Sequence, residues 1–309
     1  MMTTPPAPML SETAQSPAEW YTLNDALCFE AERLPHPLPA GLLRGVGVFT
    51  AIRWLPGLGS FRLTQHYNRL RDNAAFYGWP CPWPDATAFG KSLADLMARP
   101  PFNTRPTLLR VTLLPLYTSL DDPKLAANSP VATWLTHRPL PVDMDEASRL
   151  FVNTGRARSL QTVSFERPHP GVKHINYYME SVSVQAAVDA GFDDVLRRSA
   201  QGLIQEASRA NIFFLRSQDG VVLTPSVASG CLPGVMRQAL IEAAPTLGLQ
   251  VLEDRIEAGQ LAEMTGAWMS NSGGGLIPVD RIDDHAVPTE AVYSLLGRLS
   301  EALVARYTQ

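Results

Sequence analysis

The sequence has very little cysteine. Only three cysteines occur in 309 residues, Cys28, Cys81 and Cys231, and they lie far apart in the chain. Their number and spacing fit neither a disulfide framework nor a CxxC or Cys/His metal motif. This pattern is typical of proteins from a reducing compartment, so we expect a cytoplasmic location.

The sequence also lacks clustered positive charge and long hydrophobic runs. Its formal net charge is −4, and no run of Lys and Arg stands out, so a nucleic acid or an anionic membrane surface is not an expected partner. No segment approaches the roughly 18 apolar residues of a membrane span. Residues 1–18 lack the basic start and apolar stretch of a signal peptide. We predict a soluble protein whose residues 1–18 form a disordered tail.

The chain does contain enough apolar residues for one large core or two ordinary ones. Hydrophobic residues make up 45% of the sequence and charged residues 18%. Residues 138–147 combine prolines and acidic residues without any helical or strand period, which is typical of a connector. We therefore predict a small N-terminal α/β domain over residues 19–137, a linker over 138–147, and a larger domain over 148–309.

The smaller predicted domain alternates strands and helices. Residues 47–55 and the segment from Phe61 read as a hairpin around the turn PGLGS. Thr64 is predicted to cap a helix that ends at Gly78, and Asp85 to cap a second helix. The apolar runs at residues 106–117 and 130–137 are predicted to be strands.

The larger predicted domain has the same mixed character. Glycines at 191 and 248 mark the ends of two of its helices. Turn signals separate four short strands between residues 194 and 224. The predicted strands include residues 149–154, 250–256 and 267–271, and the predicted helices are residues 174–190, 232–247 and 288–307.

Several residues could carry chemistry, and each also has a plain structural interpretation. Lys173 lies between a proline-rich segment and a helix start, a position that fits an ordinary surface lysine as well as a reactive amine. Glu206 lies between apolar strand segments, where a carboxylate is costly unless it is paired, although a turn acid facing solvent fits too. The helix that opens at Gly234 has no side-chain cap, so its first N–H groups can bind an anion. The segment 270–275 is either a phosphate or carboxylate nest or a flexible loop, and Arg69 is either an anion ligand or a solvated helix arginine.

The order of these groups resembles the class IV aminotransferase family, the pyridoxal-phosphate enzymes of fold type IV. Glu206 follows Lys173 by 206 − 173 = 33 positions, and Gly234 follows Glu206 by 234 − 206 = 28. The resemblance extends from Gly45 to Val279. It implies a two-domain α/β (α+β) fold, with a smaller N-terminal lobe and a larger C-terminal lobe that contains a mixed barrel-like sheet. The segments similar to the family are GVGVFTAIR, HYNRLRDNA, GVKHINYYMESV, EASRANIFF, LTPSVASGCLPGVMRQ and MSNSGGGLIPV.

The resemblance assigns a role to each candidate residue. Lys173 would form the Schiff base with pyridoxal 5′-phosphate and then carry a proton between the substrate α-carbon and C4′. Glu206 would pair with the pyridine nitrogen, and Tyr178 would bond the phenolic oxygen. The implied phosphate ligands are Arg69, the backbone N–H groups of Val235 and Met236, and Ser272.

The resemblance also indicates the substrate side and two possible reactions. Gly273 and Gly274 would bind the substrate carboxylate, Arg44 and Arg110 are candidate partners for an acidic substrate, and Phe49 would shape the pocket. The first reaction is transfer of an amino group from a small amino acid to a 2-oxo acid. The alternative is aminodeoxychorismate lyase, although the threonine that assists elimination in some lyases would fall at Ala51. Family analogy also implies a homodimer.

Overall fold

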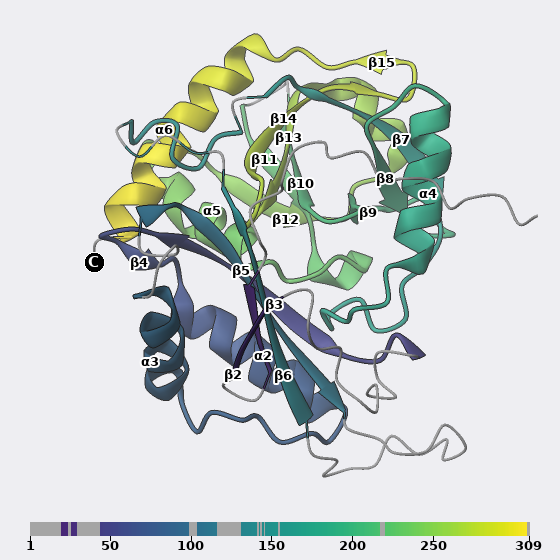
Figure 1. Ribbon diagram of the computed structural model, residues 1–309. Helices are drawn as coiled ribbons and strands as arrows, with labels where there is room; N and C mark the ends of the chain where they lie inside the picture. Colours follow the sequence, from purple (N-terminus) through teal and green to yellow (C-terminus); the bar gives the residue numbers. More distant parts are fainter. Residues whose placement is uncertain are drawn as a thin grey trace, which may run out of the picture.

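The computed structural model shows two β-sheets with helices packed on them (Figure 1). It describes residues 20–23, 26–29, 44–98, 104–115, 131–140, 142, 144, 146–153, 155–216 and 220–307. The tail predicted over residues 1–18 lies outside these ranges. Within them, no helix is long and apolar enough to cross a membrane.

The N-terminal sheet has six antiparallel strands in the order β2-β1-β6-β5-β3-β4. Alternation along its central strands gives the sheet two different faces. On β5, Leu109, Val111 and Leu113 pack into a core with the helices, whereas Leu108 and Arg110 face a cavity. The strands are β1 (Trp20–Leu23), β2 (Ala26–Phe29), β3 (Val48–Leu55), β4 (Gly59–Ser60), β5 (Thr107–Pro115) and β6 (Val131–Pro139).

Two helices cover the core face of this sheet, α2 (Leu63–Phe76) and α3 (Ala86–Met97). Asp85 caps α3 as predicted, because its side chain accepts a hydrogen bond from Ala88 N at 2.8 Å. The prediction that Thr64 caps α2 is wrong. The chain enters α2 through Arg62 in the left-handed region, so Thr64 is already inside the first turn.

The C-terminal sheet is mixed, with eight strands in the order β12-β11-β10-β13-β14-β7-β8-β9 and β15 paired to β14. The pairs β11–β12, β14–β7 and β7–β8 are parallel. This arrangement confirms the predicted α/β (α+β) fold with a mixed sheet in the C-terminal part of the chain. The strands are β7 (Arg158–Ser164), β8 (Asp194–Arg198), β9 (Ile204–Ala207), β10 (Asn211–Arg216), β11 (Val222–Pro225), β12 (Val251–Asp254), β13 (Met264–Asn271), β14 (Gly275–Ile282) and β15 (His285–Ala286).

The helices of this part are α4 (Tyr178–Asp189), α5 (Val235–Ala243) and α6 (Glu290–Tyr307), and short 3₁₀ helices span Val227–Ser229, Ala244–Leu247 and Ala258–Glu263. The predicted helix from residue 174 begins four residues late, because residues 173–175 bond to the N-terminal lobe instead. The strand predicted from residue 149 is also wrong. Its described part forms turns with one bridge, from Val152 to Leu276.

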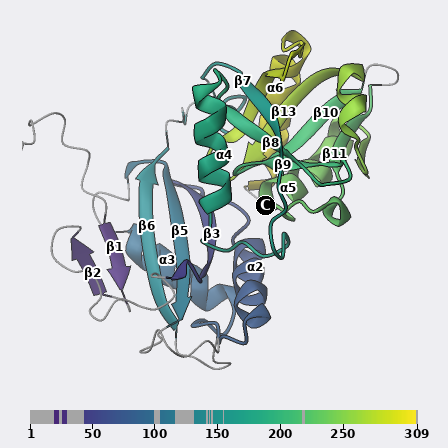
Figure 2. The same cartoon turned by 90° about the vertical axis from the view of Figure 1, so that its right-hand side faces the viewer.

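The two sheets are joined through the segment that carries Lys173. Phe49 N donates to Lys173 O at 2.9 Å, and Ile175 N donates to Gly47 O at 2.9 Å. This pairing fastens the segment with Lys173 to the start of β3. Figure 2 shows β3 on the side of the N-terminal sheet that faces the C-terminal sheet. The exact domain boundary stays a prediction, and β6 runs to Pro139, two residues into the predicted linker.

Candidate active site

A cavity of about 1020 Å³ lies between the two sheets, with Lys173 in its wall. Residues from both halves of the chain line it, and many of them belong to the segments that are similar to the family. The candidate residues that line this cavity are Phe49, Arg69, Arg110, Lys173, Glu206, Val235, Met236, Ser272, Gly273 and Gly274. Two further candidates, Arg44 and Tyr178, line a separate and smaller cavity.

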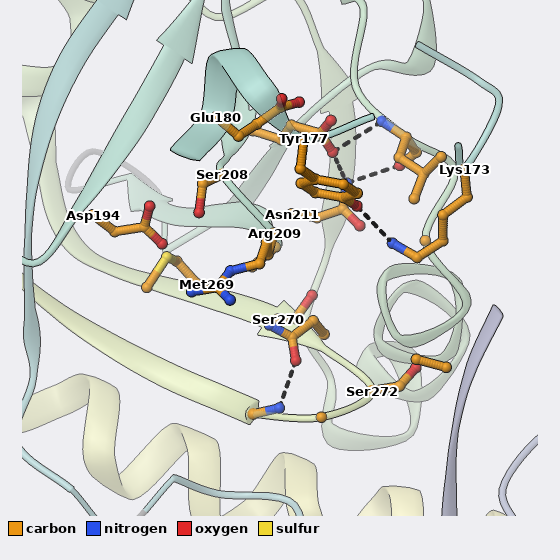
Figure 3. Close-up of a pocket in the computed structure, with 18 of the residues that line it drawn as sticks. Lys173, Tyr177, Glu180, Asp194, Ser208, Arg209, Asn211, Met269, Ser270 and Ser272 are labelled. Carbon is orange, nitrogen blue, oxygen red and sulfur yellow. Dashed lines mark hydrogen bonds between the residues drawn. The ribbon is translucent and has the colours of Figure 1, made fainter. Parts of the chain in front are cut away.

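The Lys173 amine occupies an environment that disfavours its charged form. It lies 4.7 Å from the centre of the Phe49 ring, and its Nζ donates to Tyr177 Oη at 3.4 Å (Figure 3). Burial lowers the pKa of Lys173 to about 7, with further lowering by the charges of Arg69 and Arg167 and partial compensation by Glu206. A large fraction of this amine is therefore neutral near pH 7, and a neutral amine is the form that attacks a carbonyl.

Glu206 is a buried carboxylate that accepts four hydrogen bonds from the protein. It is 4% exposed. Its Oε1 accepts hydrogen bonds from Arg167 and Arg197, both at 2.9 Å. Its Oε2 accepts from Leu232 N at 3.0 Å and Asn211 Nδ2 at 3.3 Å. The structural interpretation of Glu206 as a solvent-facing turn acid is thus excluded, and the carboxylate presents a fixed anion at the cavity wall.

The structure places Tyr177, not Tyr178, beside Lys173, so the prediction for Tyr178 is wrong. The Tyr178 side chain is 70% exposed. The segment from Lys173 to Tyr177 is not helical, and its alternate residues 173, 175 and 177 line the Lys173 cavity while 174, 176 and 178 line the smaller one. This period of two is the signal that could have identified Tyr177.

Arg167 was missed at the sequence level and connects several groups of the site. Besides Glu206, it pairs with the buried Glu180 at 3.2 Å. Its guanidinium lies 5.8 Å from the centre of the Tyr177 ring. Arg167 precedes Lys173 by six residues in the proline-rich segment ERPHPGVK. It therefore anchors both the Glu206 carboxylate and the segment that presents Lys173.

Arg69 provides a cation that lacks an acidic partner among the described residues. Its Nη2 donates to Thr50 Oγ1 at 2.7 Å, and the Thr50 hydroxyl also bonds the buried His66 ring at 2.8 Å. The Arg69 Nε atom is also buried, and it has no hydrogen-bond partner among the described residues. Burial lowers the pKa of Arg69 to about 10. A buried guanidinium without an acidic partner is suited to an anionic ligand, because the anion would replace the interactions with water that burial removes.

The start of α5 adds backbone donors to this anion site. The helix begins at Val235 after Gly234, and no side chain caps it, so its first N–H groups remain available to an anion. A Cβ on Gly234 would lie 2.1 Å from Asn211 Oδ1, a distance that no side chain tolerates. Only glycine fits there, and this close approach sets the position of the helix start beside Glu206.

Arg53 binds the backbone of the loop 272–274. It is a second arginine of the site that was not predicted from the sequence. Arg53 donates to Ser272 O and Gly273 O, each at 3.2 Å. Because C=O and N–H point in opposite directions across a trans peptide, the Gly273 N–H is directed away from Arg53. The Gly274 N–H is used differently from the prediction, since it donates to Asn271 Oδ1.

The wall formed by β5 and β6 carries two arginines. Arg110 lies 3.8 Å from the centre of the Phe49 ring. Its pKa is lowered by burial, with only Tyr177 opposing that effect. Arg138 lies on the same sheet face, because Leu108 pairs with Arg138 and Arg110 pairs with Thr136 in the sheet register. A negatively charged substrate group is complementary to this wall.

Comparison with known proteins identifies the family of this chain. A family model described as "Amino-transferase class IV" matches residues 47–282. The chain belongs to the class IV aminotransferase family. A curated relative, a putative branched-chain-amino-acid aminotransferase from Methanocaldococcus jannaschii, is 25% identical over 262 residues, which is 84% of this chain and 87% of the relative.

Solved structures share the fold of this class IV aminotransferase. One is the branched-chain aminotransferase of Thermoproteus uzoniensis with norvaline, at a TM-score of 0.79 and 22% identity, covering 93% of this chain and 95% of that chain. Another is the branched-chain amino acid aminotransferase from Escherichia coli, at a TM-score of 0.76 and 22% identity, covering 90% of this chain and 92% of that chain. These likenesses confirm the predicted fold type IV architecture.

Proposed function

We propose that this protein uses pyridoxal 5′-phosphate to move the amino group of a small or branched apolar amino acid to a 2-oxo acid. One observation carries the proposal. Lys173, with its lowered pKa, shares a single cavity with the buried Arg69 guanidinium, an uncapped helix start and a fixed carboxylate. Membership in the class IV aminotransferase family supports the amino-group transfer itself.

The residues present fit the cofactor. Arg69 with its unpartnered Nε, the first N–H groups of α5 and Ser272 would hold the phosphate. Glu206 would face the pyridine nitrogen, and Tyr177 replaces Tyr178 as the residue near the phenolic oxygen. When bound, pyridoxal phosphate supplies an electron sink for the substrate α-carbon.

The protein side chains supply proton transfer, orientation and exclusion of water. The neutral Lys173 amine would take the proton from the substrate α-carbon and would return it to C4′ of the bound cofactor. Tyr177 Oη holds this amine at 3.4 Å and so fixes its direction. Phe49, Ile175 and Ile277 line the same cavity and limit the access of water to the amine.

The proposed substrates follow from the other groups that line the Lys173 cavity. The Gly273 N–H and the guanidinium of Arg110 are donors for carboxylates, while Phe49, Leu108 and Ile175 present apolar surface to a side chain. The branched-chain names of the relatives agree with an apolar amino donor. A dicarboxylic 2-oxo acid would use Arg110 for its second carboxylate.

Nothing in the site favours the lyase alternative. The position of the threonine that assists elimination in some lyases is held by Ala51, whose methyl group lines the cavity and provides no hydroxyl. A product assay tests the choice. Holoprotein is incubated with L- and D-amino acids plus 2-oxoglutarate and, separately, with aminodeoxychorismate. Glutamate is expected from the first mixture; pyruvate and 4-aminobenzoate from the second, without glutamate from the first, would refute the aminotransferase proposal.

Replacement of Arg110 tests the acceptor site. We expect Arg110→Met to raise KM for 2-oxoglutarate by about 10- to 100-fold, because a charged hydrogen bond to the second carboxylate is lost. KM for the monocarboxylate pyruvate should change little. Arg158→Met is a matched control, since Arg158 lines the same cavity but is paired with Asp193 at 3.6 Å. Equal effects on both acceptors would show that Arg110 does not read the second carboxylate.

We also propose a cytoplasmic homodimer. Helix α4 exposes Tyr178, Met179, Val182 and Val188, apolar residues that a second copy of the chain would cover. Cys81 and Cys231 are free thiols, in keeping with a reducing compartment.

Light scattering after size exclusion tests the dimer. The measured mass of the wild type should be twice the 33.8 kDa of one chain. Val182→Asp should shift the population toward the monomer, because the interface would have to bury a charge. Val227→Asp alters another exposed apolar residue away from α4 and should leave the dimer intact. A monomeric wild type would end the dimer proposal.

A further inference from the structure

The Glu206 carboxylate carries one negative charge and pairs with two arginines. Arg167 and Arg197 both donate to the same oxygen, Oε1, at 2.9 Å. The second oxygen accepts from Leu232 N and Asn211 Nδ2. The two arginines come from different elements, one from the segment before Lys173 and one from β8.

Arg197 cannot act on a ligand directly. Its side chain is 1% exposed, and it is absent from the cavity wall. Its Nη2 also donates to Gly230 O at 3.0 Å, and its guanidinium lies 5.4 Å from the centre of the Phe165 ring. Burial lowers the pKa of Arg197, and the charge of Glu206 opposes this. Any influence of Arg197 on the chemistry must therefore pass through Glu206.

The surrounding charges give Arg197 a defined electrostatic role. Arg167 is shared, because it also pairs with Glu180 at 3.2 Å. The group Glu180–Arg167–Glu206–Arg197 thus has two negative and two positive charges, and removal of Arg197 would leave it at −1. In the described part of the chain, Lys173, Tyr177 and Cys231 also interact electrostatically with Glu206.

We propose that Arg197 is a positioning residue that holds Glu206 in place and moderates the negative potential that this carboxylate presents to the cavity. The inference rests on the proposed function, in which the pyridine nitrogen of the cofactor contacts Glu206. A lone buried carboxylate would hold the proton on that nitrogen strongly, whereas a second cation behind it weakens the hold. The proton shared by Glu206 and the nitrogen then leaves at a lower pH than it would without Arg197.

The test measures that proton directly. Cofactor labelled with ¹⁵N at the ring nitrogen is bound to wild type, Arg197→Met, Arg197→Gln and Arg197→Lys, and the ¹⁵N chemical shift is followed from pH 6 to 10. The two neutral variants should hold the proton to a pH about one to two units higher than wild type. Arg197→Lys keeps the charge and should titrate near wild type. Arg237→Met removes a buried arginine that pairs with Glu253 away from Glu206, and should not move the titration.

The outcomes separate this inference from the proposed function. If wild type binds cofactor and the neutral variants show the same resonance as wild type at every pH, Arg197 does not moderate Glu206 and the inference is overturned. If the Lys variant shifts as far as the neutral ones, the charge is not the cause, which also overturns it. A wild-type protein that fails to bind the cofactor refutes the proposed function instead. Arg197→Gln retains hydrogen-bond donors toward Gly230 O and Glu206, so the test survives if the Met variant does not fold.

Discussion

Lys173→Ala is expected to lower the rate of amino transfer by at least about 10⁴-fold, because it removes both the amine that attacks the cofactor and the group that moves the proton. The sequence has only two further lysines, Lys91 and Lys124, and Lys91, the one that the structure describes, does not line the Lys173 cavity. The fold should remain, because the Lys173 amine makes one long hydrogen bond, to Tyr177. The measurement is the rate of 2-oxo acid formation, together with the absorbance spectrum of bound cofactor.

Lys91→Ala is the control for the Lys173 variant. Lys91 is an exposed residue of α3, on the helical side of the N-terminal sheet. It should keep the wild-type rate and spectrum. A Lys173→Ala protein that is folded, retains the bound-cofactor spectrum of wild type and keeps more than a few per cent of its rate would contradict the assignment.

Glu206→Gln is expected to have the second largest effect, on both activity and stability. The neutral side chain no longer balances Arg167 and Arg197, whose guanidinium groups both bond Oε1. Leaving buried charges without their partner costs about 3–5 kcal/mol, so Tm should fall by several degrees. The rate should fall by about 100-fold or more, because the fixed anion that keeps a proton on the ring nitrogen is lost.

Glu253→Gln is a matched control for Glu206→Gln. Glu253 also bonds a buried arginine, Arg237, at 2.6 Å, but its own side chain is 44% exposed. Solvent can compensate that arginine, so the cost in Tm should be small and the rate unchanged. Similar losses of rate in the two variants would mean that Glu206 serves only the stability of the fold.

The sequence allowed the main elements of the site to be predicted because they lie in compact local blocks. Lys173, Glu206, the start of α5 at Val235 and the loop at Ser272 each have a recognisable neighbourhood, and the structure brings all four to one cavity. Asp85 was predictable as a cap for the same reason, because a cap and its helix are adjacent in sequence.

Contacts between distant segments could not be predicted in the same way. Arg53 bonds the loop carbonyl of Ser272, 219 positions away, and no local pattern reports that distance. In the sequence, nothing distinguishes Arg197 from other strand arginines; only the folded structure shows that it bonds Glu206. The resemblance implied Tyr178, but the segment from Lys173 to Tyr177 is not helical, and its alternate residues face different cavities, so Tyr177 lies beside Lys173 instead.

The central claim, that Lys173 is the reactive amine of this class IV aminotransferase, is tested most directly by chemical trapping. Protein loaded with pyridoxal phosphate is reduced with borohydride, digested, and its peptides are analysed by mass spectrometry. With three lysines in the chain, the assignment is unambiguous. We predict one phosphopyridoxyl group per chain, on the peptide that contains Lys173. Modification of Lys91 or Lys124 instead, or no fixed modification at all, would contradict the account.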